Sequence, residues 1–205
     1  MGKNGIQPTD PEGNGISSMP PVDWRDQRPD DAMVGAFDTY APPLLKAVAP
    51  GPFREAMSRY GAAVHIITTD GPAGKGGFTA TAVCSVSDDP PTLLVCVNRK
   101  SQNGHILTAN GVFCVNTLSA DHKELSNVFA GRTGASSPDR FNTGAWGALA
   151  TGAPVLTAAI AACDCRVSEI NAVGSHNVIF GVVEAISFGQ TAQALVYHDR
   201  GYKQI

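Results

Sequence analysis

Small residues and hydroxyl groups alternate in one segment of the chain, Thr79-Ala80-Thr81-Ala82-Val83-Cys84-Ser85. Small side chains let a flat ligand approach the backbone, whose N–H and C=O groups can then hydrogen-bond the heteroatoms of a ring. The same pattern is also typical of a strand with one solvated face. Composition alone leaves both interpretations open.

A second polar group, Asn98-Arg99-Lys100-Ser101, begins at the last residue of the strand expected over 92–98. Two cations and a hydroxyl in a turn at the end of a strand can hold a phosphate group. An ordinary solvated turn has the same composition, so the charges do not decide between the two.

Several other motifs are absent. The glycine-rich segment 71–77 contains neither GxxxxGK[ST] nor GxGxxG, and it leads into a predicted strand instead of a helix. No HExxH and no GxSxG occur, and Cys163-Asp164-Cys165 has no second His or Cys pair near it in the sequence. We therefore expect no metal site and no hydrolase nucleophile.

The cysteines are odd in number and form no CxxC pair; they are Cys84, Cys96, Cys114, Cys163 and Cys165. Most lie in apolar segments, which is typical of reduced, buried thiols. The sequence shows no signal peptide and no convincing membrane span. We therefore expect a cytoplasmic protein with no membrane partner.

Charge and proline content divide the 205 residues into two parts. The net charge is −3, and the first 31 residues, with three basic and six acidic side chains, account for all of it. A nucleic-acid-binding protein would instead carry a basic surplus. Residues 1–50 hold eight of the 14 prolines and are predicted to be an extended Pro/Gly-rich tail, whereas residues 51–205 are predicted to form one domain.

Short β-branched segments dominate that domain and predict six or seven strands with about three short helices. We expect strands over 62–69, 78–85, 92–98, 111–118, 159–170, 176–188 and 194–198, and helices over 53–60, 101–110 and 120–130. Regular helices do not separate the strands, which argues against a parallel sheet. The expected fold is mainly β: an antiparallel split barrel of Greek-key type with a few peripheral helices.

The sequence also resembles a known family. The segments 53–69, 77–101, 113–118, 174–184 and 194–202 are similar, in the same order, to the short-chain flavin reductases. These are FMN-binding split barrels that supply reduced flavin to two-component monooxygenases. The similarity is greatest to the reductases of pyrimidine utilisation and of 4-hydroxyphenylacetate monooxygenase. Residues 1–50 lie outside the resemblance.

The resemblance implies roles for individual residues. Those expected to border the isoalloxazine and ribityl chain are Thr79, Ala80, Thr81, Ala82, Cys84 and Ser85. Those expected near the phosphate are Asn98, Arg99 and Ser101, with Asn103 or Asn116 close by. Arg200 and Tyr202 should flank the site, Phe141 should cover the nicotinamide, and His176 should be the catalytic residue on the nicotinamide side. The family usually has an acidic residue where Ser175 stands.

The function implied is an NAD(P)H:flavin oxidoreductase that transfers hydride to FMN, or FAD, and delivers reduced flavin to a monooxygenase. Hydride transfer is the cofactor's chemistry and needs no strong general base, which suits a sequence without an evident acid–base pair. The family is typically homodimeric. Two alternatives remain: a flavin-binding redox module without turnover, and an enzyme like pyridoxamine-phosphate oxidase. The sequence does not choose FMN over FAD, or NADH over NADPH.

Overall fold

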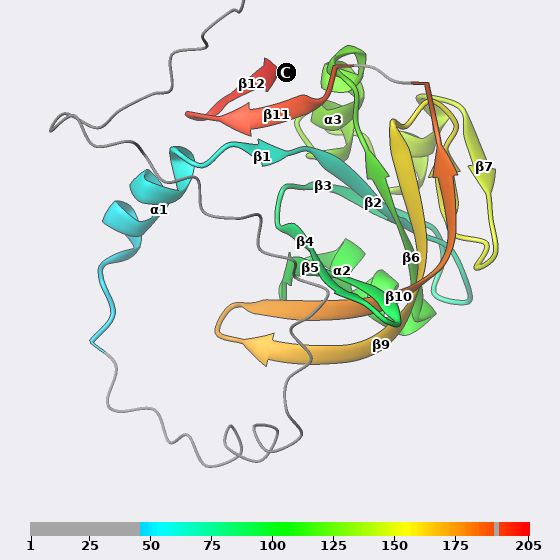
Figure 1. Ribbon diagram of the computed structural model, residues 1–205, viewed down its shortest axis with the longest axis horizontal. Coiled ribbons are helices and arrows are strands. Elements are labelled where there is room, and N and C mark those ends of the chain that lie inside the picture. Colours follow the sequence, from blue (N-terminus) through cyan, green and yellow to red (C-terminus); the bar gives the residue numbers. More distant parts are fainter. Residues whose placement is uncertain (1–45, 191–192) are drawn as a thin grey trace, which may run out of the picture. The chain divides into compact units, whose positions relative to one another are not determined.

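The computed structural model describes residues 46–190 and 193–205. The predicted tail, residues 1–50, falls almost wholly outside this part of the chain. Within it, strands form most of the structure and helices are short (Figure 1). The prediction of a mainly β fold is confirmed.

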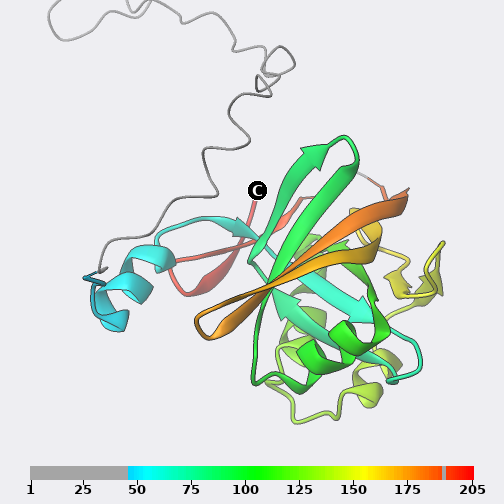
Figure 2. The same ribbon diagram turned by 90° about the horizontal axis from the view of Figure 1, so that it is seen from below.

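A seven-stranded antiparallel sheet is the main element, with strand order β3-β2-β6-β9-β10-β5-β4. The strands are β2 (His65–Thr69), β3 (Gly76–Ala80), β4 (Val83–Asp88), β5 (Pro91–Asn98), β6 (Val112–Thr117), β9 (Ala161–Val173) and β10 (His176–Phe188). The sheet curls, and the β4–β5 hairpin lies beside the long β9–β10 hairpin (Figure 2). In the described residues no ladder joins the end strands β3 and β4, so the barrel is split there.

Two smaller sheets complete the strands. One joins β1 (Ala62–Ala63), β11 (Leu195–His198) and β12 (Gly201–Gln204), and the other pairs β7 (Trp146–Ala148) with β8 (Pro154–Leu156). The sequence analysis did not predict β7, β8 or β12. The turn that leads into β12 uses Asp199 and Arg200 at φ 47° and 56°, without the glycine that usually marks such a hairpin.

The core has two parts because β2 is buried on both faces. Successive strand residues point to opposite sides, so Ile67 packs inside the barrel with Val95 and Phe113, while Ile66 packs on the other side with Phe129. All five of these side chains are almost fully buried. Each face of β2 therefore packs into a different cluster of buried side chains.

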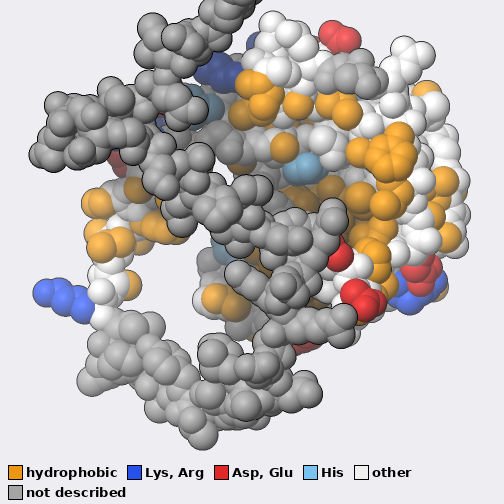
Figure 3. Space-filling view, in the orientation of Figure 1, with side chains coloured by type: hydrophobic (Ala, Val, Ile, Leu, Met, Phe, Trp, Pro, Cys, Tyr) orange, Lys and Arg blue, Asp and Glu red, His pale blue; other side chains and the backbone are white. Residues whose placement is uncertain are grey.

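The helices are α1 (Pro50–Ser58), α2 (Gln102–Asn110) and α3 (Lys123–Phe129), with 3₁₀ turns over Ala120–His122 and Pro138–Asn142. Ser101 caps α2 by accepting a hydrogen bond from the Gly104 N–H, and Gly111 ends it at φ 69°. The predicted helix over 120–130 is present, but its first turn is 3₁₀. The apolar side chains of α1 are exposed (Figure 3). Phe53 is one of them.

Candidate functional site

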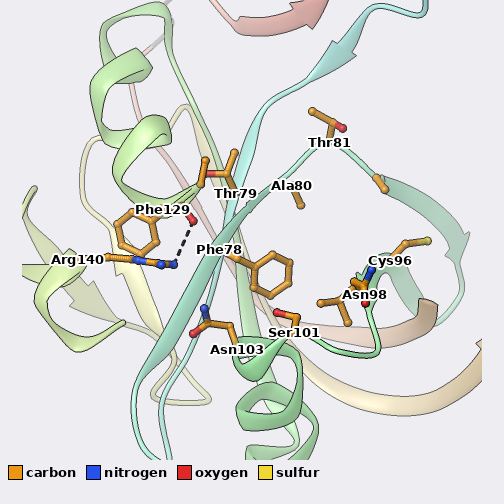
Figure 4. A pocket seen from close by; sticks show the side chains of 13 residues that line it. Phe78, Thr79, Ala80, Thr81, Cys96, Asn98, Ser101, Asn103, Phe129 and Arg140 are labelled. Carbon is orange, nitrogen blue, oxygen red and sulfur yellow. Dashed lines mark hydrogen bonds between the residues drawn. The ribbon is translucent and has the colours of Figure 1, made fainter. Parts of the chain in front are cut away.

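A cavity of about 430 Å³ opens at the split between β3 and β5 (Figure 4). Its walls come from the end of β3 and the corner after it, the end of β5, the start of α2, the end of α3 and the second 3₁₀ turn. The lining residues are Phe78, Thr79, Ala80, Thr81, Ala82, Cys96, Val97, Asn98, Ser101, Asn103, Phe129, Ala130 and Arg140. Seven of the residues predicted to border a ligand are thus brought together in one place.

The cavity exists because the predicted strand 78–85 is broken. β3 ends at Ala80 and β4 begins at Val83, so Thr81 and Ala82 form a corner between them. The sequence predicted one continuous strand, because no glycine or proline marks this corner. As β3 is an end strand, the backbone groups on its outer edge have no strand partner in the described residues. Such groups can hydrogen-bond a flat ligand.

Close packing behind β3 holds this wall in place. A Cβ at Gly77 would lie 2.7 Å from the Phe129 ring, so only glycine lets α3 approach the strand so closely. Thr79 Oγ1 donates a hydrogen bond to the Ser126 carbonyl at 2.7 Å, which joins a second residue of β3 to the same helix. The hydroxyl of Thr79 is therefore occupied by the protein, whereas Thr81 is exposed at the mouth.

Polar side chains gather at the other end of the cavity. The oxygen of Asn98 accepts the Lys100 N–H at 2.9 Å, and that of Asn103 accepts the Gly77 N–H at 3.3 Å and the Ser137 hydroxyl at 2.5 Å. These contacts fix both amides and leave their NH₂ groups without a hydrogen-bond partner among the described residues. Together with the Ser101 hydroxyl, they provide donors suited to an anion.

Arg140 adds a fixed cation that the sequence analysis missed. Its Nη1 donates to the carbonyl oxygens of Gly77 at 3.1 Å and Phe129 at 3.2 Å, and its Nε donates to Ala135 at 3.4 Å (Figure 4 shows the contact with Phe129). Its Nη2 has no hydrogen bond within the described residues. The only sequence signal was its position directly before Phe141, in a loop.

A second cavity, of about 250 Å³, lies across the end of β3 from the first. Thr79, Ala80 and Thr81 border both, and Tyr202 and Arg132 line only the second. The Tyr202 hydroxyl lies 2.8 Å from Ser126 Oγ, and the Arg132 guanidinium carbon lies 5.8 Å from the centre of the Tyr202 ring. Tyr202, which was predicted to flank the site, thus lines a cavity that shares the end of β3 with the first cavity.

A third cavity, of about 640 Å³, borders the turn after β5 and the tip of the β9–β10 hairpin. Arg99 lines this cavity and not the first. Its backbone N–H donates to Ser175 at 3.0 Å and its Nη1 donates to Gly174 at 3.4 Å, which joins the turn to the hairpin tip. Arg99 was predicted near a phosphate in the first cavity, where the structure instead has Arg140.

His176 begins β10 directly opposite Asn98 of β5. Its Nδ1 lies 2.9 Å from the Ser175 hydroxyl, and the ring is exposed. Side chains of directly paired residues point to the same face of a sheet. His176 therefore lies next to Asn98, which lines the first cavity, but His176 does not itself line that cavity.

Other predicted residues lie elsewhere. Cys84 and Ser85 are exposed on β4, beyond the corner. Arg200 pairs with Glu55 of α1 at 2.5 Å, and this hydrogen bond, with the added charge attraction, lowers the pKa of Glu55. The aromatic ring of Phe141 packs edge-on against Phe129, with centroids 5.1 Å apart. It supports the wall from behind.

Asn116 has a structural position. It is fully buried; its amide donates to the Ile66 carbonyl and the Thr68 hydroxyl, both at 3.1 Å, and its oxygen accepts the Leu156 N–H at 2.7 Å. With these groups satisfied by the protein, Asn116 has nothing to offer a ligand, and we leave it out of the proposed site.

Burial shifts the pKa values of two side chains near the cavity. Burial lowers the pKa of His65, whose neighbour across the strands is Ala80, from 6.5 to about 4. It also raises the pKa of the Cys96 thiol in the cavity wall. Both groups are therefore uncharged at neutral pH. The part of the cavity near β3 and Cys96 is uncharged, and the charge lies at Arg140.

The described residues hold no group of three or more His, Cys, Asp or Glu side chains placed to bind a metal ion. Asp164, which lies between two cysteines, is fully buried and accepts hydrogen bonds from the backbone and hydroxyl of Thr151. No helix in the described part of the chain is long and apolar enough to cross a membrane.

Comparison with known families gives a match to the flavin reductase like domain over residues 57–205. Among curated proteins, the chain is 52% identical over 165 residues to the FMN reductase (NADH) RutF of Variovorax paradoxus strain S110. The alignment covers 80% of this chain and 89% of that protein.

Solved structures agree with the sequence comparison. The chain resembles the crystal structure of a flavin reductase from Haemophilus somnus 129PT with a TM-score of 0.74 and 42% identity, over 77% of this chain and 100% of that one. It also resembles BorF, the flavin reductase component of a bacterial two-component tryptophan halogenase. There the TM-score is 0.71 and the identity 28%, over 77% of this chain and 98% of that one.

Proposed function

The chain belongs to the flavin reductase-like domain family, and from that premise we propose that it is an NAD(P)H:flavin oxidoreductase whose preferred flavin is FMN. The observation that carries the proposal is the 430 Å³ cavity at the barrel split. It combines an uncharged wall of small residues with a polar end that holds one cation.

These features fit FMN. The ring would lie along Thr79–Ala82, where small side chains expose the free edge of β3. The phosphate would lie among Ser101, Asn103 and Arg140, because the free hydrogen-bond donors of these side chains suit an anion. When bound, the flavin supplies the capacity to accept a hydride from a reduced nicotinamide.

The protein's own contribution is to position the two ligands. Thr81 is exposed at the mouth of the first cavity and also borders the smaller cavity that Tyr202 lines. A nicotinamide entering from this side would meet the flavin face to face, and holding reacting atoms close together accounts for a large part of such a rate acceleration. We place His176 on the nicotinamide side and assign it an orienting role.

NADH is the proposed nicotinamide and a monooxygenase the proposed recipient of the reduced flavin. RutF relatives carry NADH in their name, and BorF is described as a component of a two-component halogenase.

Five free thiols in the described residues suit a reducing compartment. We therefore place the protein in the cytoplasm.

We further propose that the protein is a homodimer. The outer face of β5 and β10 carries the paired side chains Leu94 with Phe180 and Cys96 with Val178, all only partly buried. At the edge of this face Val173 is 61% exposed. A second copy would cover the apolar pairs, and because Cys96 also lines the cavity, it would border the flavin.

The test is steady-state oxidation of NADH, followed at 340 nm, with FMN and without it. The proposal expects turnover that depends on added FMN, and reduced FMN that passes to a separate monooxygenase. Tightly retained flavin that NADH does not reduce would contradict it and would favour a flavin-binding module. For the dimer, sedimentation should give twice the mass of the chain, and Phe180→Asp should give the monomer.

A further inference from the structure

Helix α1 has little contact with the rest of the described fold. None of its nine residues is buried, and none belongs to either core cluster. Figures 1 and 2 show it projecting from the barrel on the same side as the tip of the β9–β10 hairpin. An isolated helix shorter than ~12–15 residues is marginal in water, so α1 needs a surface to pack against.

One side of α1 is apolar and uncovered. Phe53 and Met57 are four residues apart, and Tyr60 follows three residues later in the turn that ends the helix, so their side chains share one side. The exposed fractions of Phe53, Met57 and Tyr60 are 55%, 41% and 66%. Large apolar side chains gathered on the surface in this way are typical of a contact with another protein.

Polar contacts fix the position of the helix. Arg200 donates a hydrogen bond to the Glu55 carboxylate at 2.5 Å, and the Asp199 N–H donates to the Ser58 carbonyl at 2.7 Å. Both contacts come from the turn between β11 and β12. Exposed ion pairs of this kind add little stability, but they hold the apolar side of α1 in one place while the barrel leaves it open.

The charges of α1 point to what covers it. Glu55 is already paired, with Arg200 and with Arg59. Arg54, next to Phe53, is the remaining charged residue of the helix, and it forms no ion pair in the part of the chain that the structure describes. The surface that receives α1 should therefore be apolar, with a free negative charge at its edge.

The outer face of β5 and β10, proposed above as the dimer contact, continues onto β9 with such a charge. Glu169 of β9 stands directly across from Phe180 and so points to the same face. It accepts one hydrogen bond, from the Asn171 amide at 2.8 Å, and forms no ion pair within residues 46–190 and 193–205. Glu184 of β10 is not available in this way, because it pairs with Arg166 at 2.6 Å.

We propose that α1 packs on the outer face of β9 and β10 of a second copy of this chain, with Arg54 beside Glu169 of the partner subunit. In a two-fold dimer this contact occurs twice, because each copy presents both surfaces. The helix and the hairpin project from the same side of the barrel, so two copies exchange their helices across one interface. This inference rests on the proposed homodimer and names the segment that joins its subunits.

An exchange of charges tests the contact. Sedimentation velocity at a series of concentrations gives the Kd of the dimer for the full chain, Arg54→Glu, Glu169→Arg and the double variant. Each single variant places like charges at both copies of the contact, and we expect its Kd to rise about tenfold or more. The double variant restores opposite charges, and its Kd should return to within about threefold of the wild type.

Two matched controls belong to this experiment. Asp88 is an exposed carboxylate at the end of β4, outside the proposed contact, so Asp88→Arg should not rescue Arg54→Glu. Phe53→Ala should raise the Kd of the dimer by about tenfold, since it removes an aromatic side chain from the contact. Leu149→Ala should not, because this exposed leucine follows β7, on the opposite side of the barrel from α1.

The possible results separate this inference from the proposals on which it rests. A double variant that dimerises as weakly as the single variants would overturn the pairing of Arg54 with Glu169 and with it the proposal. An unchanged Kd for Phe53→Ala would also overturn it and would assign the apolar side of α1 to another segment of the same chain or to a different protein. A dimer that Phe180→Asp dissociates and the α1 variants do not would contradict this inference alone. A monomeric wild type would contradict the proposed homodimer as well.

Discussion

His176 of β10 stands directly across the sheet from Asn98 of β5, and Asn98 borders the 430 Å³ cavity in which we propose that the flavin binds. The antiparallel register therefore brings the histidine from a hairpin tip to the edge of a cavity whose lining residues all lie 36 or more positions earlier in the chain. The Ser175 hydroxyl, 2.9 Å from its Nδ1, sets the orientation of the ring.

Replacement of His176 should affect the nicotinamide and not the flavin. We expect His176→Asn to lower kcat/KM for NADH by about tenfold, because a misplaced ring costs orientation, while the Kd of FMN stays within twofold. Steady-state kinetics and fluorescence titration measure the two quantities. His198→Asn, another exposed histidine near a strand end, is the control. Equal losses in both variants would refute a specific role for His176.

Arg140 should be needed for both the wall and the phosphate. Arg140→Ala removes the donor to three carbonyl oxygens, and unfolding in urea should show a loss of about 1–3 kcal/mol. FMN should bind more weakly, by about tenfold or more, while riboflavin, which lacks the phosphate, should be much less affected. Should FMN and riboflavin weaken equally, Arg140 would be structural only.

A large side chain at the corner should close the cavity. Ala82→Trp places an indole where the ring of FMN is expected, at an exposed position that tolerates bulk. We expect FMN affinity to fall at least tenfold with thermal stability unchanged. Val86→Trp, on strand β4 that follows the corner and 48% exposed outside the lining, is the matched control and should bind FMN normally. Normal FMN binding by Ala82→Trp would move the flavin elsewhere.

Acid should destabilise the fold through His65. Its pKa is about 4 in the folded protein and 6.5 in an ordinary environment, so the unfolded chain takes up the proton first. Stability is therefore full above pH 6.5 and is lost as the pH falls towards 4, with about 2 kcal/mol gone at pH 5. Urea unfolding at pH 7.5 and pH 5 measures this. His65→Gln should remove most of the difference, and an unchanged pH dependence would contradict the assignment.

Local patterns predicted most strands and the main wall of the site. The alternation of small and hydroxyl residues in Thr79–Ala82 located that wall, and Ser101 and Gly111 correctly marked the ends of α2. These signals are local, because a cap or a small residue acts on its immediate neighbours.

What the sequence could not predict depends on contacts between distant segments. Arg140 acquires its role only where the loop meets β3 and α3. The family resemblance placed Asn116 near the phosphate, yet its side-chain amide hydrogen-bonds the Ile66 carbonyl and the Leu156 N–H in the core. Buried backbone groups need such hydrogen-bond partners. The corner at Thr81 carries no glycine or proline, so it could not be distinguished from a continuing strand. The turn after β11 places its positive φ values at Asp199 and Arg200, ahead of Gly201, so its residues did not mark a hairpin into β12.

The central claim is that the flavin ring lies at the barrel split, along Thr79–Ala82. A crystal structure of the protein soaked with FMN tests it most directly. The account predicts ring density in the cavity beside Ala82 and Cys96, with the phosphate among Ser101, Asn103 and Arg140. Bound FMN seen at any other place, with this cavity filled by side chains or solvent, would contradict it.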